Sequence, residues 1–205
     1  MQPHNCWHCG STSTESLFCR YCNTLQRPTP DYYRFMGLEP RLSLDAADLQ
    51  KRFYSLSRLL HPDRFNRASP TEQKYSLEAT AILNDAYRVL RDPVSRAEYI
   101  LKDEGFEIGE QKSKDVPPEL LEEVFELNMA LEELRGGDEA MRPQLDQARS
   151  RFLGLRREVD DSLARLYTAY DSTRDRERLA EIRGLLNRRR YIQNLVNEVE
   201  RELTP

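Results

Sequence analysis

The chain has 205 residues, with 31 lysines and arginines against 35 aspartates and glutamates, so its formal charge is −4. This slight acidity argues against a protein that binds nucleic acid mainly by charge. The sequence also holds no uncharged apolar run of the roughly 20 residues that a membrane span needs. The mean hydropathy is low, at −0.77, but the apolar residues recur at helical spacing. We therefore expect a soluble, mostly helical protein.

All four cysteines lie within the first 22 residues, as two Cys-x-x-Cys pairs with nine residues between them. Two such pairs suit tetrahedral thiolate coordination of one Zn²⁺ ion by Cys6, Cys9, Cys19 and Cys22. Four thiolates complete the coordination sphere, so the predicted site is structural and has no place for a substrate. A segment of this length cannot build a core alone, so its folding energy is expected to come largely from the metal.

Other uses of these cysteines fit less well. Two disulfides would require a secreted chain, but only five residues precede Cys6 and they include no apolar stretch. A redox Cys-x-x-Cys needs one pair at a strand-to-helix junction. Iron in the same four-sulfur site stays open, because spacing alone does not separate iron from zinc. His8 lies inside the first pair, and we interpret it as a bystander.

Helices are predicted over residues 31–37, from about 45 to 61, from 69 to 92 and from 93 to 101. Ser43 and Asp45 are both good N-caps for the second helix, Ser69 is a good N-cap for the third, and Pro62 disfavours helix at the residue before it. The second helix has one apolar stripe: Leu49, Phe53, Leu56 and Leu60. The third is expected to bury Tyr75, Ala79, Ile82, Ala86 and Val89. Two amphipathic helices joined by a short loop are expected to pack antiparallel.

The loop of this hairpin contains the tripeptide His61-Pro62-Asp63. Alone, such a tripeptide is typical of an ordinary helix end. Its context is more specific. Together with segments 84–93 and 96–99, it resembles the J-domain of DnaJ-type co-chaperones over about residues 31–102.

J-domains stimulate ATP hydrolysis by a DnaK-type heat-shock chaperone. The resemblance implies that His61, Pro62 and Asp63 are the stimulatory signature. It also implies docking by the bases around the second helix, which lie off its apolar stripe: Lys51, Arg52, Arg58 and Arg64. One physical account has Asp63 accept a charge-assisted hydrogen bond from a chaperone arginine, while the bases steer the domain onto an acidic patch.

The C-terminal half has helical patterns near 118–134, 142–170 and 175–203, joined by short loops. Long amphipathic helices with short loops predict an antiparallel three-helix bundle. Charge is concentrated on the first of them, because residues 107–134 carry 2 bases and 9 acids.

This first helix has two apolar faces. One narrow stripe consists of Leu120, Val124, Leu127, Leu131 and Leu134. A second ridge lies roughly 100–180° away at 100° per residue: Leu121, Phe125 and Met129, flanked by Glu122, Glu126 and Glu133. A single core cannot cover both faces. The ridge either packs on the preceding domain or forms a docking surface for a partner that is apolar and basic.

The acidic helix resembles the scaffold-binding helix of the HscB family, in which a J-domain precedes a three-helix bundle that binds IscU, the scaffold for iron–sulfur cluster assembly. The resemblance implies contacts by Leu121, Glu122, Phe125, Glu126, Met129 and Glu133, and by Tyr191 on the last helix. Met129 replaces a usual acid, and Glu122 stands where an apolar residue is common. Some family members, notably eukaryotic ones, also have an N-terminal zinc module.

We therefore expect an all-α chain with a zinc module over 1–27, a J-domain over 28–106 and a scaffold-binding bundle over 107–205. Its expected function is that of a co-chaperone that binds an IscU-type scaffold and stimulates a DnaK/HscA-type ATPase, promoting cluster transfer. It has no apparent catalytic site, nucleic-acid partner or membrane partner. Without a transit peptide, we expect a bacterial cytoplasmic protein, although a processed mitochondrial form fits the same sequence.

Two rival functions stay open. A generic J-protein with another client shares the prediction for His61 but needs no contact with the scaffold. A zinc-ribbon protein that binds nucleic acid needs a basic face around the cysteines, where the sequence has only Arg20 and Arg27. Neither the quaternary structure nor the affinities follow from the sequence.

Overall fold

The computed structural model describes residues 4–13, 16–107 and 120–204. The fold is all-α, as predicted; the strands within these ranges are the antiparallel pair β1 (His4–Asn5) and β2 (Thr12–Ser13) beside the cysteines. The chain forms two compact units, Met1–Tyr99 and Ile100–Pro205. Among the residues described, no helix combines the length and the apolar character that a membrane crossing requires.

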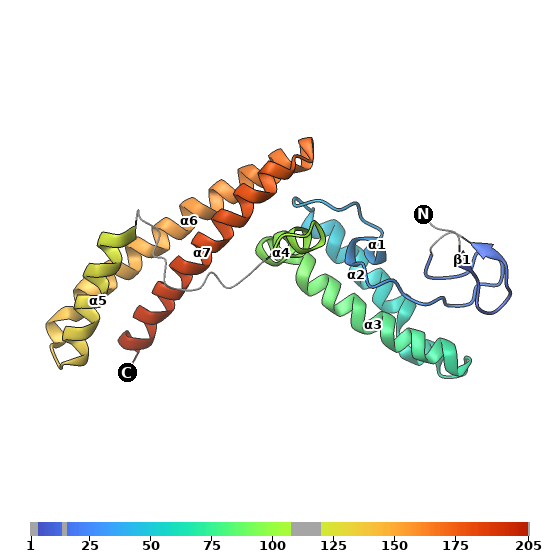
Figure 1. Ribbon diagram of the computed structural model, residues 1–205. Coiled ribbons are helices and arrows are strands. Elements are labelled where there is room, and N and C mark those ends of the chain that lie inside the picture. The colour runs from blue at the N-terminus through green and yellow to red at the C-terminus, as the bar shows by residue number, and fades with distance from the viewer. Residues whose placement is uncertain (1–3, 14–15, 108–119, 205) are drawn as a thin grey trace. The chain divides into compact units, whose positions relative to one another are not determined.

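The first unit contains the predicted hairpin. Helix α1 spans Tyr32–Met36, α2 spans Ala46–Leu60, α3 spans Pro70–Arg91, and α4 (Pro93–Asp103) continues into the second unit. Helix α3 packs against α1, α2 and the 3₁₀ turn η1 (Pro62–Phe65), and α2 and α3 lie side by side in Figure 1.

The helix starts follow from local capping chemistry. The Asp45 carboxylate accepts the N–H groups of Ala47 and Asp48 at the start of α2. The Ser69 hydroxyl accepts the N–H of Glu72, with Pro70 in the first helical position of α3. The sequence predicted Ser69 as the N-cap of α3, whereas for α2 it left Ser43 and Asp45 open, and the structure selects Asp45.

The buried face of α3 differs from the prediction by one residue. Ala79 and Ala86 are buried as expected, but Ser76, Leu83 and Leu90 replace Tyr75, Ile82 and Val89 as the other fully buried positions. Because α3 contacts both α1 and α2, its buried face is centred between them. The buried face is turned by less than the roughly 100° of one full residue, since Ala79 and Ala86 belong to both sets.

The described residues of the second unit include the end of α4 and the helices α5 (Leu121–Arg135), α6 (Arg142–Thr173) and α7 (Arg176–Leu203) (Figure 1). The predicted start of the acidic helix near 118 lies outside the described residues. Arg189, which interrupts the apolar stripe of α7, pairs with Asp160 of α6 at 2.5 Å between Nε and Oδ1. The interruption is therefore a polar contact between packed helices.

The core stripe of α5 is confirmed. Its members are at most 8% exposed: Leu120, Val124, Leu127, Leu131 and Leu134. Because this stripe is buried against the rest of the bundle, the opposite side of α5 faces outward.

Candidate functional site

The four cysteines converge as a metal site requires. Their sulfur atoms all lie within 4.8 Å of one another, with Cys6 and Cys22 3.6 Å apart and Cys9 and Cys19 3.8 Å apart. A tetrahedral zinc site with Zn–S bonds of about 2.3 Å separates its sulfurs by about 3.8 Å. The geometry therefore fits a metal ion bound by four thiolates.

Tight turns bring each pair of cysteines together. The N–H of Gly10 donates to the carbonyl of Cys6, and the N–H of Asn23 donates to the carbonyl of Cys19. Gly10 and Asn23 have φ values of 72° and 57°, in the left-handed region that favours glycine and asparagine. His8 donates its backbone N–H to the Cys6 sulfur at 3.4 Å.

The thiols have unequal acidities. Burial disfavours the Cys6 thiolate, but the backbone N–H groups of Cys9 and His8 and the neighbouring thiols outweigh it and lower the pKa to about 6. Donation by Thr24 lowers the pKa of Cys22, yet burial and the adjacent thiols raise it to about 11. Four thiolates this close repel one another, so full ionisation of the cluster calls for a bound cation.

The His-Pro-Asp loop (residues 61–69) presents its polar side chains to solvent. The side chains of His61 and Asp63 are 55% and 81% exposed. The His61 Nδ1 accepts the N–H of Asp63 at 3.3 Å and lies 3.5 Å from its carboxylate. Phe65 is buried and anchors the far side of η1. The loop therefore offers an ordered carboxylate to another molecule.

The four predicted docking bases are not equivalent. Arg52 is engaged within its own domain, since it pairs with Asp48 at 2.8 Å and donates to the carbonyl of Gly37 at 2.9 Å. The side chains of the other three are exposed and form no ion pair with any residue that the structure describes: Lys51, Arg58 and Arg64.

Sequence reasoning missed Tyr54, which is 53% exposed on α2. At 100° per residue it lies on the same outer side of the helix as Lys51 and Arg58. The available signal was its position away from the apolar stripe, where a large aromatic side chain has no core to fill.

The apolar ridge of α5 is exposed. Leu121, Phe125 and Met129 are 54%, 66% and 48% exposed, and the glutamates beside them are also exposed: Glu122, Glu126 and Glu133. Three large apolar side chains in a row on one helix form a contiguous patch with an acidic border.

Tyr191 lies on the side of α7 that faces α5. It shares a helical face with Glu198 and Glu202, both of which pair with Arg135 of α5, at 3.6 and 2.7 Å. Burial, followed by the charge of Glu198, raises the pKa of Tyr191.

Two contacts locate Tyr191 along the bundle. Helix α6 packs on both α5 and α7 and serves as the reference. Because Arg189 of α7 pairs with Asp160 of α6, Tyr191 is level with residue 158 of α6. Glu123, at the start of α5, pairs with Arg151 of α6 at 2.7 Å. Seven residues of helix correspond to about 10 Å. Tyr191 therefore lies about 10 Å beyond the level of Glu123, past the N-terminal end of α5.

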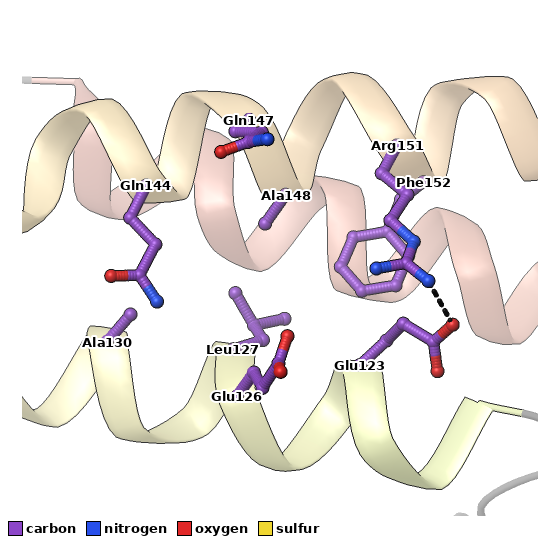
Figure 2. Close-up of a pocket in the computed structure, with 9 residues that line it drawn as sticks. All are labelled: Glu123, Glu126, Leu127, Ala130, Gln144, Gln147, Ala148, Arg151 and Phe152. Atoms are coloured by element: carbon purple, nitrogen blue, oxygen red, sulfur yellow. Dashed lines mark hydrogen bonds and ion pairs between the residues drawn. The ribbon is translucent and has the colours of Figure 1, made fainter.

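A groove of about 260 Å³ runs between α5 and α6. Figure 2 shows the Glu123–Arg151 pair closing one end of it, with Glu126 at its edge. Its lining combines apolar and polar side chains: Leu127, Ala130, Ala148 and Phe152, with Glu123, Glu126, Gln144, Gln147 and Arg151. This groove could not be predicted from the sequence, because its polar rim is formed by residues of two helices that are separate in the sequence. Glu126 borders both the ridge and the groove.

Two families match the two functional regions. The DnaJ domain matches residues 31–99, and the HSCB C-terminal oligomerisation domain matches residues 116–200. The iron–sulfur cluster co-chaperone protein HscB of Homo sapiens is 31% identical, and the alignment covers 98% of this chain and 83% of the human protein. This chain belongs to the HscB family of co-chaperones.

Other HscB proteins agree. The co-chaperone protein HscB homolog of Vibrio vulnificus (strain CMCP6) is 32% identical over 83% of this chain and 95% of its own length. The crystal structure of human co-chaperone protein HscB matches with a TM-score of 0.74 and 30% identity, over 98% of this chain and 100% of that one. Chaperone HscB from Vibrio cholerae matches with a TM-score of 0.59 and 28% identity, over 83% and 96%. The resemblance drawn from motifs is thus confirmed.

Proposed function

We propose that this HscB-family chain is an adaptor in iron–sulfur cluster biogenesis. Its bundle binds an IscU-type scaffold, and its J-domain stimulates ATP hydrolysis by a DnaK/HscA-type chaperone, which promotes transfer of the cluster. This role requires no catalytic site in the chain itself. The domains of this proposal are 1–27, 28–106 and 107–205, and its location is the bacterial cytoplasm.

The observation that carries the proposal is the exposed ridge of α5. A helix whose core stripe is fully buried still presents Leu121, Phe125 and Met129 to solvent. Exposed apolar clusters rimmed by polar residues are typical of protein interfaces, and the five glutamates of α5 favour a partner with basic residues. Tyr191, on the side of α7 that faces α5, extends this surface.

The J-domain contributes a second, separate contact. The Asp63 carboxylate is available to a chaperone arginine as a charge-assisted acceptor, and Pro62 restricts the backbone of the loop. Lys51, Arg58 and Arg64 steer the domain electrostatically. Stimulation requires only that the J-domain bind the hydrolysis-competent state of the chaperone more tightly than the other state.

Simultaneous binding explains the adaptor role. A chain that holds the scaffold on one unit and the chaperone on the other raises the effective concentration of each for the other. ATP hydrolysis then takes place where the scaffold is already present.

We also propose that Zn²⁺ occupies the four-cysteine site in a structural role. The sulfur spacing supports a tetrahedral ion, and the complete set of four thiolates favours structure over catalysis. Metal analysis of the purified chain is expected to give one zinc per chain. Iron in that position, or a protein equally stable after chelation, would contradict this assignment.

Isothermal calorimetry of the full chain with an IscU-type scaffold tests the function. We expect saturable binding at one site per chain. Stimulation of the chaperone ATPase without scaffold binding would indicate a J-protein with another client. Binding to nucleic acid instead of either protein would contradict the proposal altogether.

A further inference from the structure

The cysteine module (residues 4–27) contacts the first turns of α3. The indole N–H of Trp7 donates to the carbonyl of Leu25 at 2.8 Å, and its ring meets that of Tyr75 edge-on at 6.2 Å. The N–H of Leu25 donates to Oε1 of Glu72 at 3.3 Å. Leu25 is fully buried and lies three residues after Cys22. The module therefore reaches α3 through a segment that directly follows a metal ligand.

The same turn of α3 holds the His-Pro-Asp loop. The second oxygen of Glu72, Oε2, accepts the hydroxyl of Ser69, the N-cap residue of α3, at 3.2 Å. The side-chain amide of Gln73 donates to the carbonyls of Asn66 and Ala68, at 3.3 and 3.1 Å. Neighbouring residues of one helical turn thus contact the loop.

The next turn fixes the other end of the loop. The buried hydroxyl of Ser76 donates to the carbonyl of Leu60 at 2.7 Å, and Leu60 immediately precedes His61. Glu72 and Tyr75 contact the cysteine module, whereas Gln73 and Ser76 contact the loop. The first two turns of α3 therefore connect the metal site to the loop.

We propose that a metal ion in the four-cysteine site orders the start of α3 and, through it, the His-Pro-Asp loop, with Glu72 as the positioning residue that couples them. The inference rests on the metal site of the proposed function. It adds that metal occupancy adjusts the part of the J-domain that the chaperone would contact.

The physical reason is the size of the module. A segment of about 25 residues does not hold its fold without the metal. When the metal leaves, Leu25 no longer presents its N–H to Glu72, and Trp7 no longer covers Tyr75. The Glu72 carboxylate then loses its hydrogen bond from the Leu25 N–H and is held less firmly beside Ser69. The helix cap weakens, and the loop opens more often.

Coupling of this kind is reciprocal. If metal binding favours the ordered cap, the ordered cap must favour metal binding by the same factor. A change at Glu72 is therefore expected to alter the metal affinity of cysteines that it does not touch.

Hydrogen exchange of the full chain, with zinc and after removal of zinc by a chelator, measures the coupling. We expect amides in residues 66–76 to exchange roughly two to thirty times faster without zinc, the range that loss of one helix cap produces. Peptides from α7, in the other unit, are expected to exchange equally in both states. Unchanged α7 peptides also show that the chain remains folded.

Substitutions at Glu72 isolate the link. In Glu72→Ala, zinc is expected to slow exchange in 66–76 less than twofold, and chelator competition is expected to show zinc bound several-fold more weakly. Glu72→Gln keeps a carbonyl oxygen as acceptor and should retain most of the response. Glu78→Ala is the matched control, because Glu78 lies on α3 but pairs with Lys74 at 3.8 Å.

Two results would overturn the inference. One is an exchange rate in residues 66–76 that is the same with and without zinc although zinc binds. The other is a Glu72→Ala protein in which zinc slows this exchange as much as in the wild type. A chain that binds no metal would instead refute the metal site of the proposed function. The two failures are therefore distinguishable.

Discussion

The His61 side chain orients the backbone of Asp63. The imidazole Nδ1 accepts the N–H of Asp63 and lies 3.5 Å from its carboxylate, at the surface of the loop. The ring therefore orients the backbone of Asp63, and the Asp63 carboxylate stays exposed.

His61→Gln is expected to abolish stimulation of the chaperone ATPase while leaving helical content unchanged. Glutamine is more flexible and does not hold the Asp63 backbone in the same way, and His61 is too exposed to affect the core. Single-turnover ATP hydrolysis with a DnaK-type chaperone measures this, with circular dichroism as the fold control. A fully active variant would remove the docking role from this loop.

Phe125→Ala is expected to weaken scaffold binding by about tenfold or more, because a large side chain at the centre of an interface acts as an anchor. Phe125 is 66% exposed in the free chain, so folding should be unaffected. Calorimetry gives the affinity. Leu77→Ala is the matched control, since Leu77 is 60% exposed but belongs to α3 and not to α5. Equal affinities of Phe125→Ala and the wild type would exclude the ridge as the docking surface.

The burial or exposure of single residues could be predicted where apolar residues recur at regular helical spacing. The two faces of α5 follow from helical spacing, so the burial of Leu127 and the exposure of Phe125 could both be expected. Arg52 was predicted only as a docking base. Its acceptor, the carbonyl of Gly37, lies 15 residues earlier in the chain, and no local pattern reports such a contact.

Among the elements, α3 organises the J-domain. It packs against α1, α2 and η1, and its side chains bind backbone carbonyls of the loop that carries His61. Capping chemistry located both of its ends from the sequence. Three of its five predicted inward positions were wrong by one residue. The inward face of α3 depends on its contacts with both α1 and α2 and not on the apolar pattern of α3 alone.

Ser76→Ala tests this organisation. The Ser76 hydroxyl is buried and donates to the carbonyl of Leu60, so its removal should destabilise the J-domain by about 1 kcal/mol. Thr80→Ala is expected to cost less, because the Thr80 contact with the same carbonyl is longer, at 3.4 Å, and only partly buried. Urea denaturation compares the two variants. A larger loss for Thr80→Ala would contradict this account of the α2–α3 junction.

At the scale of the whole molecule, the chain joins two protein-binding units in one polypeptide. The DnaJ match and the HSCB match fall on separate ranges, 31–99 and 116–200. The change in charge and the helical patterns indicated this division from the sequence. The precise level of Tyr191 along the bundle did not follow from the pattern, because it depends on pairs such as Asp160–Arg189 between helices.

The adaptor account requires both contacts to belong to the same chain. His61→Gln keeps the ridge, and Phe125→Ala keeps the loop, so each variant retains one contact. If tethering is what matters, the two variants mixed in equal amounts cannot replace the wild type, because neither chain brings scaffold and chaperone together.

The most direct test is the ATPase rate of a DnaK/HscA-type chaperone with IscU-type scaffold present at a concentration too low for efficient binding without an adaptor. The wild-type chain is expected to stimulate the rate strongly, and an equimolar mixture of His61→Gln and Phe125→Ala should do no better than the Phe125→Ala chain alone. Full stimulation by the mixture would contradict the account.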